Sequence, residues 1–396
     1  MKVAAAPPGQ RQEPRRAAEP RTRRRQQATG AAADFVFVGI PGPRLDAATA
    51  ALLAASRPGG VVLFRRNLTT PAQLFALVSE LRRLLPAAVL AVDAEGGRVD
   101  RLSGLVGPAP AASLLARRPP PLARQAGHWI AQALRLFDLD LDFAPVVDLD
   151  RGETGNALDG RYLGSRDAAV TQRARAFLRG LHGGGVGGCL KHFPGLGAAE
   201  ADTHHRTAVV RLSAAALALH LKPYAALLPL AGAVMVSHAV YPALDREERP
   251  ASLSPPVIEG LLRGKLGFDG LVVSDDLEMQ ALADRGDLPA RAEAAFAAGC
   301  DLVLACATTA ALPEIVARLG RPRHAARRRD AGRRLAVWRQ RLRALRWDGD
   351  LRDLPSLAAG GGAAGLAGPP RDPAERRARL GAVRDGLAEL RRQLEA

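Results

Sequence analysis

Eight short apolar runs, rich in β-branched residues, recur along the chain and alternate with segments of helical periodicity. The runs lie at 35–40, 60–64, 88–93, 139–149, 187–192, 233–238, 271–275 and 301–305. Between them, the segments 72–85, 123–137, 168–182, 213–228, 255–266 and 289–298 show the apolar spacing of amphipathic helices. Eight strands alternating with helices over about 310 residues are typical of a closed (β/α)8 or TIM barrel. We therefore expect an α/β fold with a single catalytic domain of this type.

An open, doubly wound sheet is the alternative arrangement for such a pattern. Its first strand is usually followed by a glycine-rich turn that holds a phosphate group. Here the first run is followed by Pro41-Gly42-Pro43, which cannot form a GxGxxG turn. The sequence therefore favours the barrel.

The formal net charge of +16 comes from two segments. Residues 1–30 carry eight basic and two acidic residues, and residues 321–346 carry eleven arginines against Asp330 alone, so the rest of the chain is balanced. The basic segments lack interleaved aromatic residues that could stack on bases. A polyanion-binding protein with a vestigial barrel is thus the weaker, non-enzymatic alternative, and no specific nucleic-acid partner is expected.

The composition divides the chain into three parts. Residues 1–30 are rich in Pro, Arg and Gln and are expected to form a disordered basic extension. Residues 31–347 are expected to form the barrel, ending in a long basic helix over 327–347. Residues 348–396 are expected to form a flexible linker at 358–370 and a charged helical tail at 372–396.

The sequence also gives expectations about the cellular location of the protein and the state of its cysteines. The N-terminal residues contain no apolar core typical of a secretory signal, and no stretch of 18 apolar residues occurs, so we expect a cytoplasmic protein without a membrane span. Cys189, Cys300 and Cys306 form no CxxC pair and no disulfide framework, and they are expected to be buried, reduced thiols.

Polar side chains follow five of the eight predicted strands. They are found in the stretches 93–98, 148, 191–195, 237–238 and 274–276. In a TIM barrel the catalytic groups project from the C-terminal ends of the strands. Carboxylates, a Lys-His pair and arginines without metal-ligand spacing suit the binding and cleavage of a polyhydroxylated ligand. We expect neither a metal nor an organic cofactor.

Two elements carry reactive groups. Asp275 and Asp276 end one strand, and because successive strand residues point to opposite faces, only one of them is expected to enter the mouth. Asp202 stands two residues before His204, where a carboxylate can orient an imidazole and favour its protonated form. Each element also has a plain structural explanation, as a helix N-cap or a surface loop. Together they are typical of a retaining glycosidase.

In this order, the motifs resemble those of the bacterial β-N-acetylglucosaminidases of glycoside hydrolase family 3, the single-domain cytoplasmic type of peptidoglycan recycling. The resemblance runs from about Phe35 to Trp347 and rests on VDAEGGRVDRL (92–102), DFAPVVDL (142–149), KHFPGLG (191–197), DTHH (202–205), VSHAVYPALD (236–245) and GFDGLVVSDDLEM (267–279). It implies a monomeric hydrolase that releases terminal β-linked N-acetylglucosamine from muropeptides or related oligosaccharides.

The resemblance also implies roles for individual residues. Asp275 would be the nucleophile, His204 the acid/base and Asp202 its orienting partner. The terminal sugar would be bound by Asp93, Arg101, Arg161, Lys191 and His192, with Glu95 and Arg98 as scaffold. The chain departs from the family in having Leu196 in place of a usual second histidine, and in the sequence around Arg161.

Two enzymatic alternatives stay open. A phosphorylase or a β-glucosidase of the same family would use the same fold, and a histidine acid/base lacks the negative charge that would repel phosphate. A metal-dependent barrel hydrolase is disfavoured because no His-X-His follows the first predicted strand.

Overall fold

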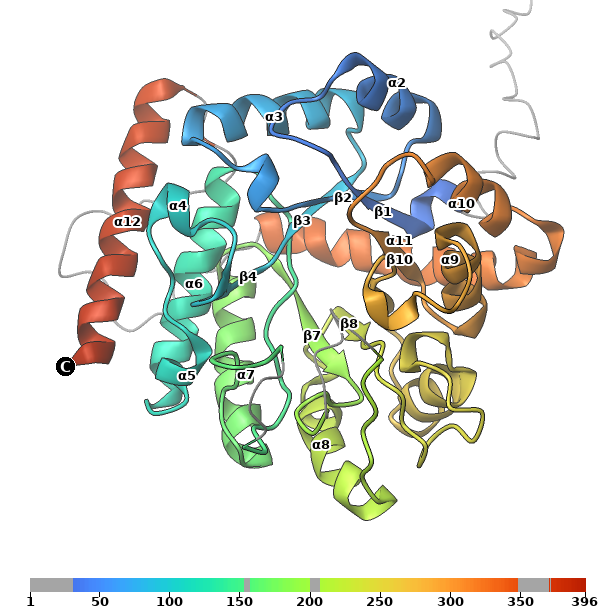
Figure 1. Cartoon of the computed structure of the whole chain (residues 1–396). Coiled ribbons are helices and arrows are strands. Elements are labelled where there is room, and N and C mark those ends of the chain that lie inside the picture. The colour runs from blue at the N-terminus through green and yellow to red at the C-terminus, as the bar shows by residue number, and fades with distance from the viewer. Residues whose placement is uncertain (1–30, 153–156, 200–206, 348–369, 371) are drawn as a thin grey trace, which may run out of the picture.

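A closed barrel of eight parallel strands forms the centre of the molecule (Figure 1). The structure is a computed structural model that describes residues 31–152, 157–199, 207–347, 370 and 372–396. The barrel strands are β1 (Val36–Gly39), β2 (Gly60–Leu63), β3 (Val89–Val92), β6 (Leu141–Asp142), β7 (Gly187–Phe193), β8 (Ala233–Val236), β9 (Leu271–Asp276) and β10 (Leu302–Ala305). Strand β1 pairs with both β2 and β10, so the ring is closed and the predicted fold is confirmed.

The fourth barrel strand is much shorter than its apolar run predicts. Of residues 139–149, only Leu141–Asp142 form regular ladder pairs. Pro145 follows three residues later and has no N–H group to donate to a neighbouring strand. The chain nevertheless stays beside β7, since Val147 N donates to Lys191 O over 2.9 Å.

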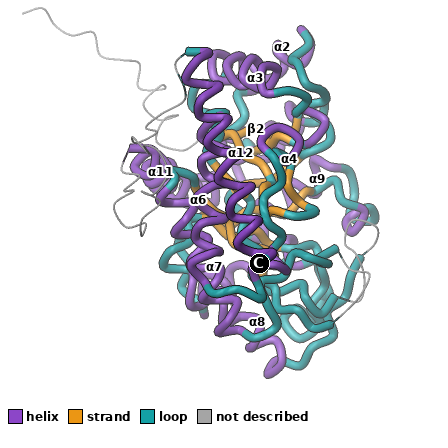
Figure 2. Tube along the Cα trace, turned by 90° about the vertical axis from the view of Figure 1, so that its left-hand side faces the viewer, coloured by secondary structure: helices purple, strands orange, loops and turns teal. Residues whose placement is uncertain are grey.

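Helices surround the barrel on all sides (Figures 1 and 2). They are α2 (Ala47–Ser56), α3 (Pro71–Leu84), α6 (Pro120–Leu136), α7 (Asp167–Gly183), α8 (Ala214–Leu227), the π-helical η4 (Pro256–Lys265), α9 (Leu288–Ala298) and α10 (Leu312–Leu319). Side chains at the N-caps of four of them accept a backbone N–H of the first turn, namely Asp46, Thr70, Ser213 and Asp287. All six predicted helical segments are confirmed, and α2 and α10 complete the ring.

A short insertion follows β3 on the C-terminal side of the barrel. The antiparallel hairpin β4 (Ala94–Gly96) and β5 (Val99–Asp100) is followed by the short helices α4 (Ser103–Val106) and α5 (Ala112–Leu115). Gly96 and Gly97 have φ values of +89° and +61°, a backbone conformation that favours glycine, at the tip of the hairpin. The EGGR motif is therefore a tight turn that reaches over the barrel mouth.

The basic helix α11 (Ala325–Trp347) lies across the N-terminal end of the barrel. Arg327 and Arg334 contact the fully buried carboxylate of Asp301, immediately before β10, at 2.9 and 3.3 Å. Arg339 contacts Asp34, just before β1, at 2.9 Å. These arginines neutralise carboxylates of the barrel, which weakens the alternative that they form a polyanion-binding surface.

The C-terminal helix α12 (Pro373–Glu395) packs against the outside of the barrel. It lies beside α6 and α4 in both views (Figures 1 and 2). Its buried stripe consists of Val383, Leu387, Leu390 and Leu394, each no more than 3% exposed. The predicted helical tail is thus docked on the barrel, whereas the expectations for residues 1–30 and for the linker fall outside the described residues.

Two further findings concern the described part of the chain. The three cysteines are free and buried, as predicted. None of the helices in these ranges is long and apolar enough to cross a membrane.

Candidate active site

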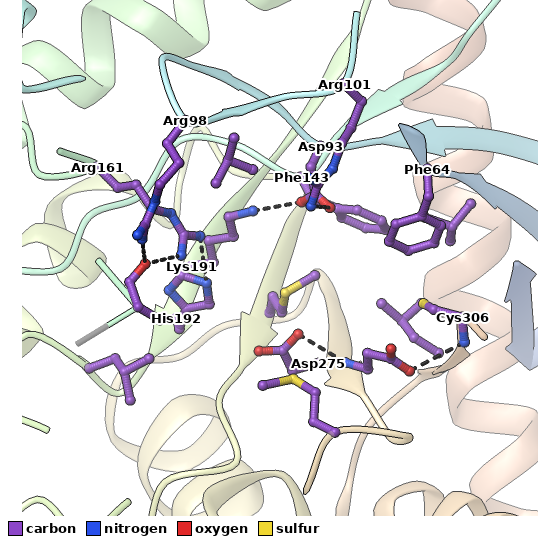
Figure 3. A pocket seen from close by; sticks show the side chains of 18 residues that line it. Phe64, Asp93, Arg98, Arg101, Phe143, Arg161, Lys191, His192, Asp275 and Cys306 are labelled. Carbon is purple, nitrogen blue, oxygen red and sulfur yellow. Dashed lines mark hydrogen bonds and ion pairs between the residues drawn. The ribbon is translucent and has the colours of Figure 1, made fainter. Parts of the chain in front are cut away.

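A cavity of about 400 Å³ opens at the C-terminal end of the barrel (Figure 3). Six of the eight residues predicted for the site line it, namely Asp93, Arg101, Arg161, Lys191, His192 and Asp275. They come from the ends of β3, β7 and β9, from the β4–β5 hairpin and from the loop before α7. The other two, Asp202 and His204, lie outside the described residues.

Lys191 forms the centre of a charged network. Its Nζ lies 2.8 Å from Asp93 Oδ1 and 2.5 Å from Glu95 Oε1, and the residue is 2% exposed. Burial opposes the positive charge, but the carboxylates of Asp93 and Glu95 outweigh it and raise the pKa of Lys191 above its ordinary value. Lys191 is therefore a fixed ammonium donor at the cavity wall.

Glu95 links the two buried cations of the site. It accepts Arg161 Nε and Nη2, each over 2.8 Å, in a bidentate pair, while also contacting Lys191. Burial alone would raise the pKa of Glu95, but Lys191 and Arg161 lower it from 4.5 to about 2. The residue that sequence analysis placed in the scaffold therefore holds two predicted sugar-binding side chains in position.

His192 is oriented by Asp148, which sequence analysis noted only as a polar strand end. His192 Nδ1 donates to Asp148 Oδ2 over 2.8 Å, and Asp148 Oδ1 accepts Leu196 N over 2.7 Å. Because Nδ1 carries this hydrogen bond, Nε2 is the nitrogen left to face Arg161, at 3.4 Å from its Nη2. The backbone of Leu196, and not its side chain, contributes to this arrangement.

Asp275 and Asp276 both line the cavity, so the expectation that only one would enter the mouth is wrong. The pairing of β9 with β10 shifts register between Leu302 and Leu304, and Leu304 pairs with Asp276. The two carboxylates nevertheless differ. Asp276 Oδ1 accepts the N–H groups of Glu278 and Cys306 at 3.1 and 3.2 Å.

The nucleophile candidate lies across the cavity from Asp93 and Arg101 (Figure 3). Asp275 Oδ1 accepts the N–H of Asp276 over 2.9 Å. Burial raises the pKa of Asp276 to about 6, because a charged carboxylate loses its solvation there. Oδ1 of Asp276 is held by the N–H groups of two separate segments, at Glu278 and Cys306, whereas Oδ1 of Asp275 accepts the N–H of the adjacent residue, which favours Asp275 for chemistry.

A buried histidine, His238, supports the backbone at the end of β9. His238 Nε2 donates to the carbonyl of Asp276 over 2.8 Å, and its Nδ1 accepts the hydroxyl of Ser252 over 2.7 Å. Sequence analysis singled out Ser237-His238 as a strand end without assigning it a role. The structure makes His238 a support for the peptide that follows the two carboxylates.

The cavity also has an apolar wall, formed by Phe64, Phe143, Met235 and Leu304 among others. Such a wall suits the C–H faces of a sugar ring, while the charged network suits its hydroxyl groups. Within the described residues, no group of three or more His, Cys, Asp or Glu side chains is placed to hold a metal ion.

Comparison with known proteins agrees with this geometry. Residues 30–333 match the model of the glycosyl hydrolase family 3 N-terminal domain. A β-hexosaminidase of Tolumonas auensis is 38% identical over 294 residues, covering 72% of this chain and 87% of that protein. A β-hexosaminidase of Pseudomonas aeruginosa is 36% identical over 330 residues, covering 78% of this chain and 97% of that protein.

A solved structure, NagZ of Neisseria gonorrhoeae in complex with N-trifluoroacetyl-D-glucosamine, superposes with a TM-score of 0.68 at 29% identity, covering 90% of this chain and 97% of that chain. The chain therefore belongs to glycoside hydrolase family 3. Within that family it matches proteins named β-hexosaminidase, and it is a glycoside hydrolase of the β-N-acetylhexosaminidase type.

Proposed function

We propose that this chain is a retaining exo-β-N-acetylglucosaminidase that acts through a covalent glycosyl-Asp275 intermediate. The observation that carries the proposal is a network of hydrogen-bonding groups, Asp93, Lys191 and Arg161, lining the same cavity as the Asp275 carboxylate. The relatives' names and the glucosamine derivative bound by the Neisseria protein support the sugar assignment.

The chemistry proceeds in two steps. Asp275 attacks the anomeric carbon while His204, as an imidazolium, protonates the departing glycosidic oxygen. His204 then removes a proton from water, which attacks the anomeric carbon and releases both the sugar and Asp275. The roles of His204 and Asp202 rest on the DTHH motif at 202–205.

The residues around the cavity suit the binding of one terminal sugar. Asp93 accepts hydrogen bonds from sugar hydroxyl groups, and Lys191 and Arg161 donate hydrogen bonds to hydroxyl oxygens. Nε2 of His192 serves as a further hydrogen-bond acceptor. A cavity of about 400 Å³ lies at the small end of the range for small-molecule sites, ~300–1,000 Å³, which fits one terminal sugar. We propose muropeptides or related oligosaccharides as substrates and a monomer acting in the cytoplasm.

Aryl glycosides test the reaction directly. We expect release of 4-nitrophenol from its β-N-acetylglucosaminide, with the β-glucoside at least about 10-fold slower, since the latter lacks the acetamido group's contacts. The rate is expected not to depend on added phosphate, and the product is expected to be free N-acetylglucosamine. A requirement for phosphate with formation of the sugar 1-phosphate would identify a phosphorylase, and preference for the glucoside would identify a β-glucosidase.

His204→Ala tests the acid/base assignment. We expect kcat/KM for a disaccharide substrate, whose leaving group needs a proton, to fall by about 10²–10⁴-fold. The 2,4-dinitrophenolate of an activated glycoside departs without protonation, so the rate of glycosylation by this substrate is expected to change far less. The adjacent His205→Ala is the matched control. A loss that is equal for both leaving groups, or equal in both variants, would contradict the assignment.

A further inference from the structure

We propose that the C-terminal helix α12 positions the sugar-binding arginines through the segment 103–118, with Arg384 as the foremost positioning residue. This inference rests on the proposed roles of Arg101 and Arg161 in binding the sugar. Helix α12 lies beyond residues 30–333, the part of the chain that matches the family, and contributes no side chain to the lining of the cavity. Its influence must therefore pass through other residues.

The segment 103–118 is joined to the hairpin that carries Arg101. The carboxylate of Asp100 accepts the N–H groups of Leu102 and Ala109 over 3.1 and 2.9 Å. Gly97 N donates to Ala109 O over 3.0 Å, so the tip of the hairpin is tied to the same turn. Asp100 is 3% exposed, and these bonds are therefore protected from water. A shift of residues 103–109 must move the hairpin.

The same segment reaches the loop that carries Arg161. Ser113 N, in α5, donates to the carbonyl of Gly160 over 3.2 Å. The carbonyl of Ala157 accepts both Arg161 Nη1, over 2.9 Å, and the guanidinium of Arg98 from the hairpin. Both sugar-binding arginines are thus anchored on structure that abuts residues 103–118.

Helix α12 is hydrogen-bonded to residues 103–118 at two points. Arg384 donates from Nη2 and Nε to the carbonyl of Leu105 in α4, over 2.8 and 3.3 Å. Arg118, at the other end of the segment, donates from Nη2 and Nε to the carbonyl of Leu394, over 2.5 and 3.1 Å. The second contact satisfies a carbonyl in the last turn of α12 and is favoured by the negative end of the helix dipole.

The body of α12 is held in place against α6. Its stripe of buried apolar residues faces the barrel, and Gly386 lies so close to Trp129 that a Cβ there would come within 2.2 Å of the indole ring. At the N-terminal end, the guanidinium of Arg376 lies 4.5 Å from the ring centre of Phe75 in α3. These contacts define one packing position for α12, and in that position Arg384 lies within hydrogen-bond distance of the Leu105 carbonyl.

Two glycines of α12 provide a matched test. Gly386→Ala places a methyl group against Trp129 and lifts the helix, whereas Gly381→Ala adds the same group where nothing lies within 4 Å. Both changes raise helix propensity equally. We expect Gly386→Ala to raise KM for the 4-nitrophenyl N-acetylglucosaminide by about 3- to 10-fold with kcat changed less than about 2-fold. Gly381→Ala should match the wild type.

Arg384→Gln removes the contact with Leu105 and leaves the apolar stripe intact. It is expected to reproduce the rise in KM. Arg391→Gln is its control, because Arg391 is 42% exposed and contacts Glu395 of the same helix over 3.3 Å. Hydrogen exchange of residues 99–118 gives a readout independent of activity. We expect faster exchange there in Gly386→Ala and Arg384→Gln than in either control.

An unchanged KM in both variants, with only a lower melting temperature, would show that α12 is purely structural and would overturn the proposal. Unchanged exchange of residues 99–118 would overturn it as well. If the wild type itself fails to turn over the N-acetylglucosaminide, the proposed function fails, and the exchange measurement still decides whether α12 braces the segment.

Discussion

Asp275→Ala is expected to lower kcat/KM for 4-nitrophenyl β-N-acetylglucosaminide by about 10³–10⁵-fold, the largest effect of any single substitution in the site. Without the carboxylate no covalent intermediate can form, and the positive charge that develops at the anomeric carbon loses its nearest counter-charge. Folding should persist, since Asp276 keeps its bonds to Glu278 N and Cys306 N. Steady-state kinetics and a thermal melt measure the two properties separately.

Trapping identifies the attacking residue independently of the loss of rate. A fluorinated N-acetylglucosaminyl inactivator is expected to add one sugar to the wild type, and peptide mass spectrometry should place it on Asp275. Asp276→Asn is the neighbouring control, because the amide oxygen can still accept both backbone N–H groups, and it should remain labelled. A label on Asp276, or normal turnover by Asp275→Ala, would show that the nucleophile is misassigned.

Glu95→Gln is expected to destabilise the fold by about 3–5 kcal/mol at pH 7, because it leaves the buried cations of Lys191 and Arg161 without their shared counter-ion. The pKa of Glu95 is lowered from 4.5 to about 2 in the folded protein. A lowered pKa means that the stability it confers is fully present above about pH 4.5 and is lost as the pH falls towards 2.

Urea unfolding at pH 7 and at pH 3 tests this sign. The difference between wild type and Glu95→Gln should be large at pH 7 and smaller at pH 3, where part of the wild-type contribution has gone. Glu247→Gln is the control: it pairs with Arg249 at 3.0 Å but is 72% exposed, so its removal should cost no more than about 1 kcal/mol. An equal difference at both pH values would mean that Glu95 acts through packing and not through charge.

The barrel was predictable because its strands are apolar on both faces and stand out as short β-branched runs. The details that were predicted wrongly have local causes. Pro145 shortens the fourth strand, a local effect that the length of an apolar run does not reveal. Helix α2 was not predicted, since its sequence AATAALLAAS has almost no polar residues to mark an exposed face.

Contacts between distant segments were beyond the sequence. The helical character of residues 373–395 follows from their composition, but the pairing of their apolar stripe with α6 depends on where the barrel places that helix. In the same way, the eleven arginines of 321–346 appeared only as a surplus of charge. Asp301 and Asp34, which pair with three of these arginines, are isolated acidic residues that no local pattern connects to α11.

The candidate site shows the same division. Six residues predicted from the motifs line one cavity, because the C-terminal ends of the barrel strands meet at the same end of the barrel. Glu95 was predicted as scaffold but without its partners, and no role was predicted for Asp148, although both residues stand in quoted motifs. Glu95 is placed between Lys191 and Arg161 only when the hairpin folds back over the mouth. Asp202 and His204 stay predictions.

The way α11 is fastened sets a lower limit on the smallest working unit of this enzyme. The ring closes where β1 meets β10, and Arg339 and Arg334 attach α11 to the carboxylates just before those two strands. Both arginines lie beyond residue 333, where the family match ends. A fragment cut at that boundary would retain every described strand, but Asp34 would lose Arg339, and Asp301 would lose Arg334 while keeping Arg263 and Arg327. A shortened chain should therefore extend at least to Trp347, and it must also keep α12 for the sugar-binding arginines to stay in position.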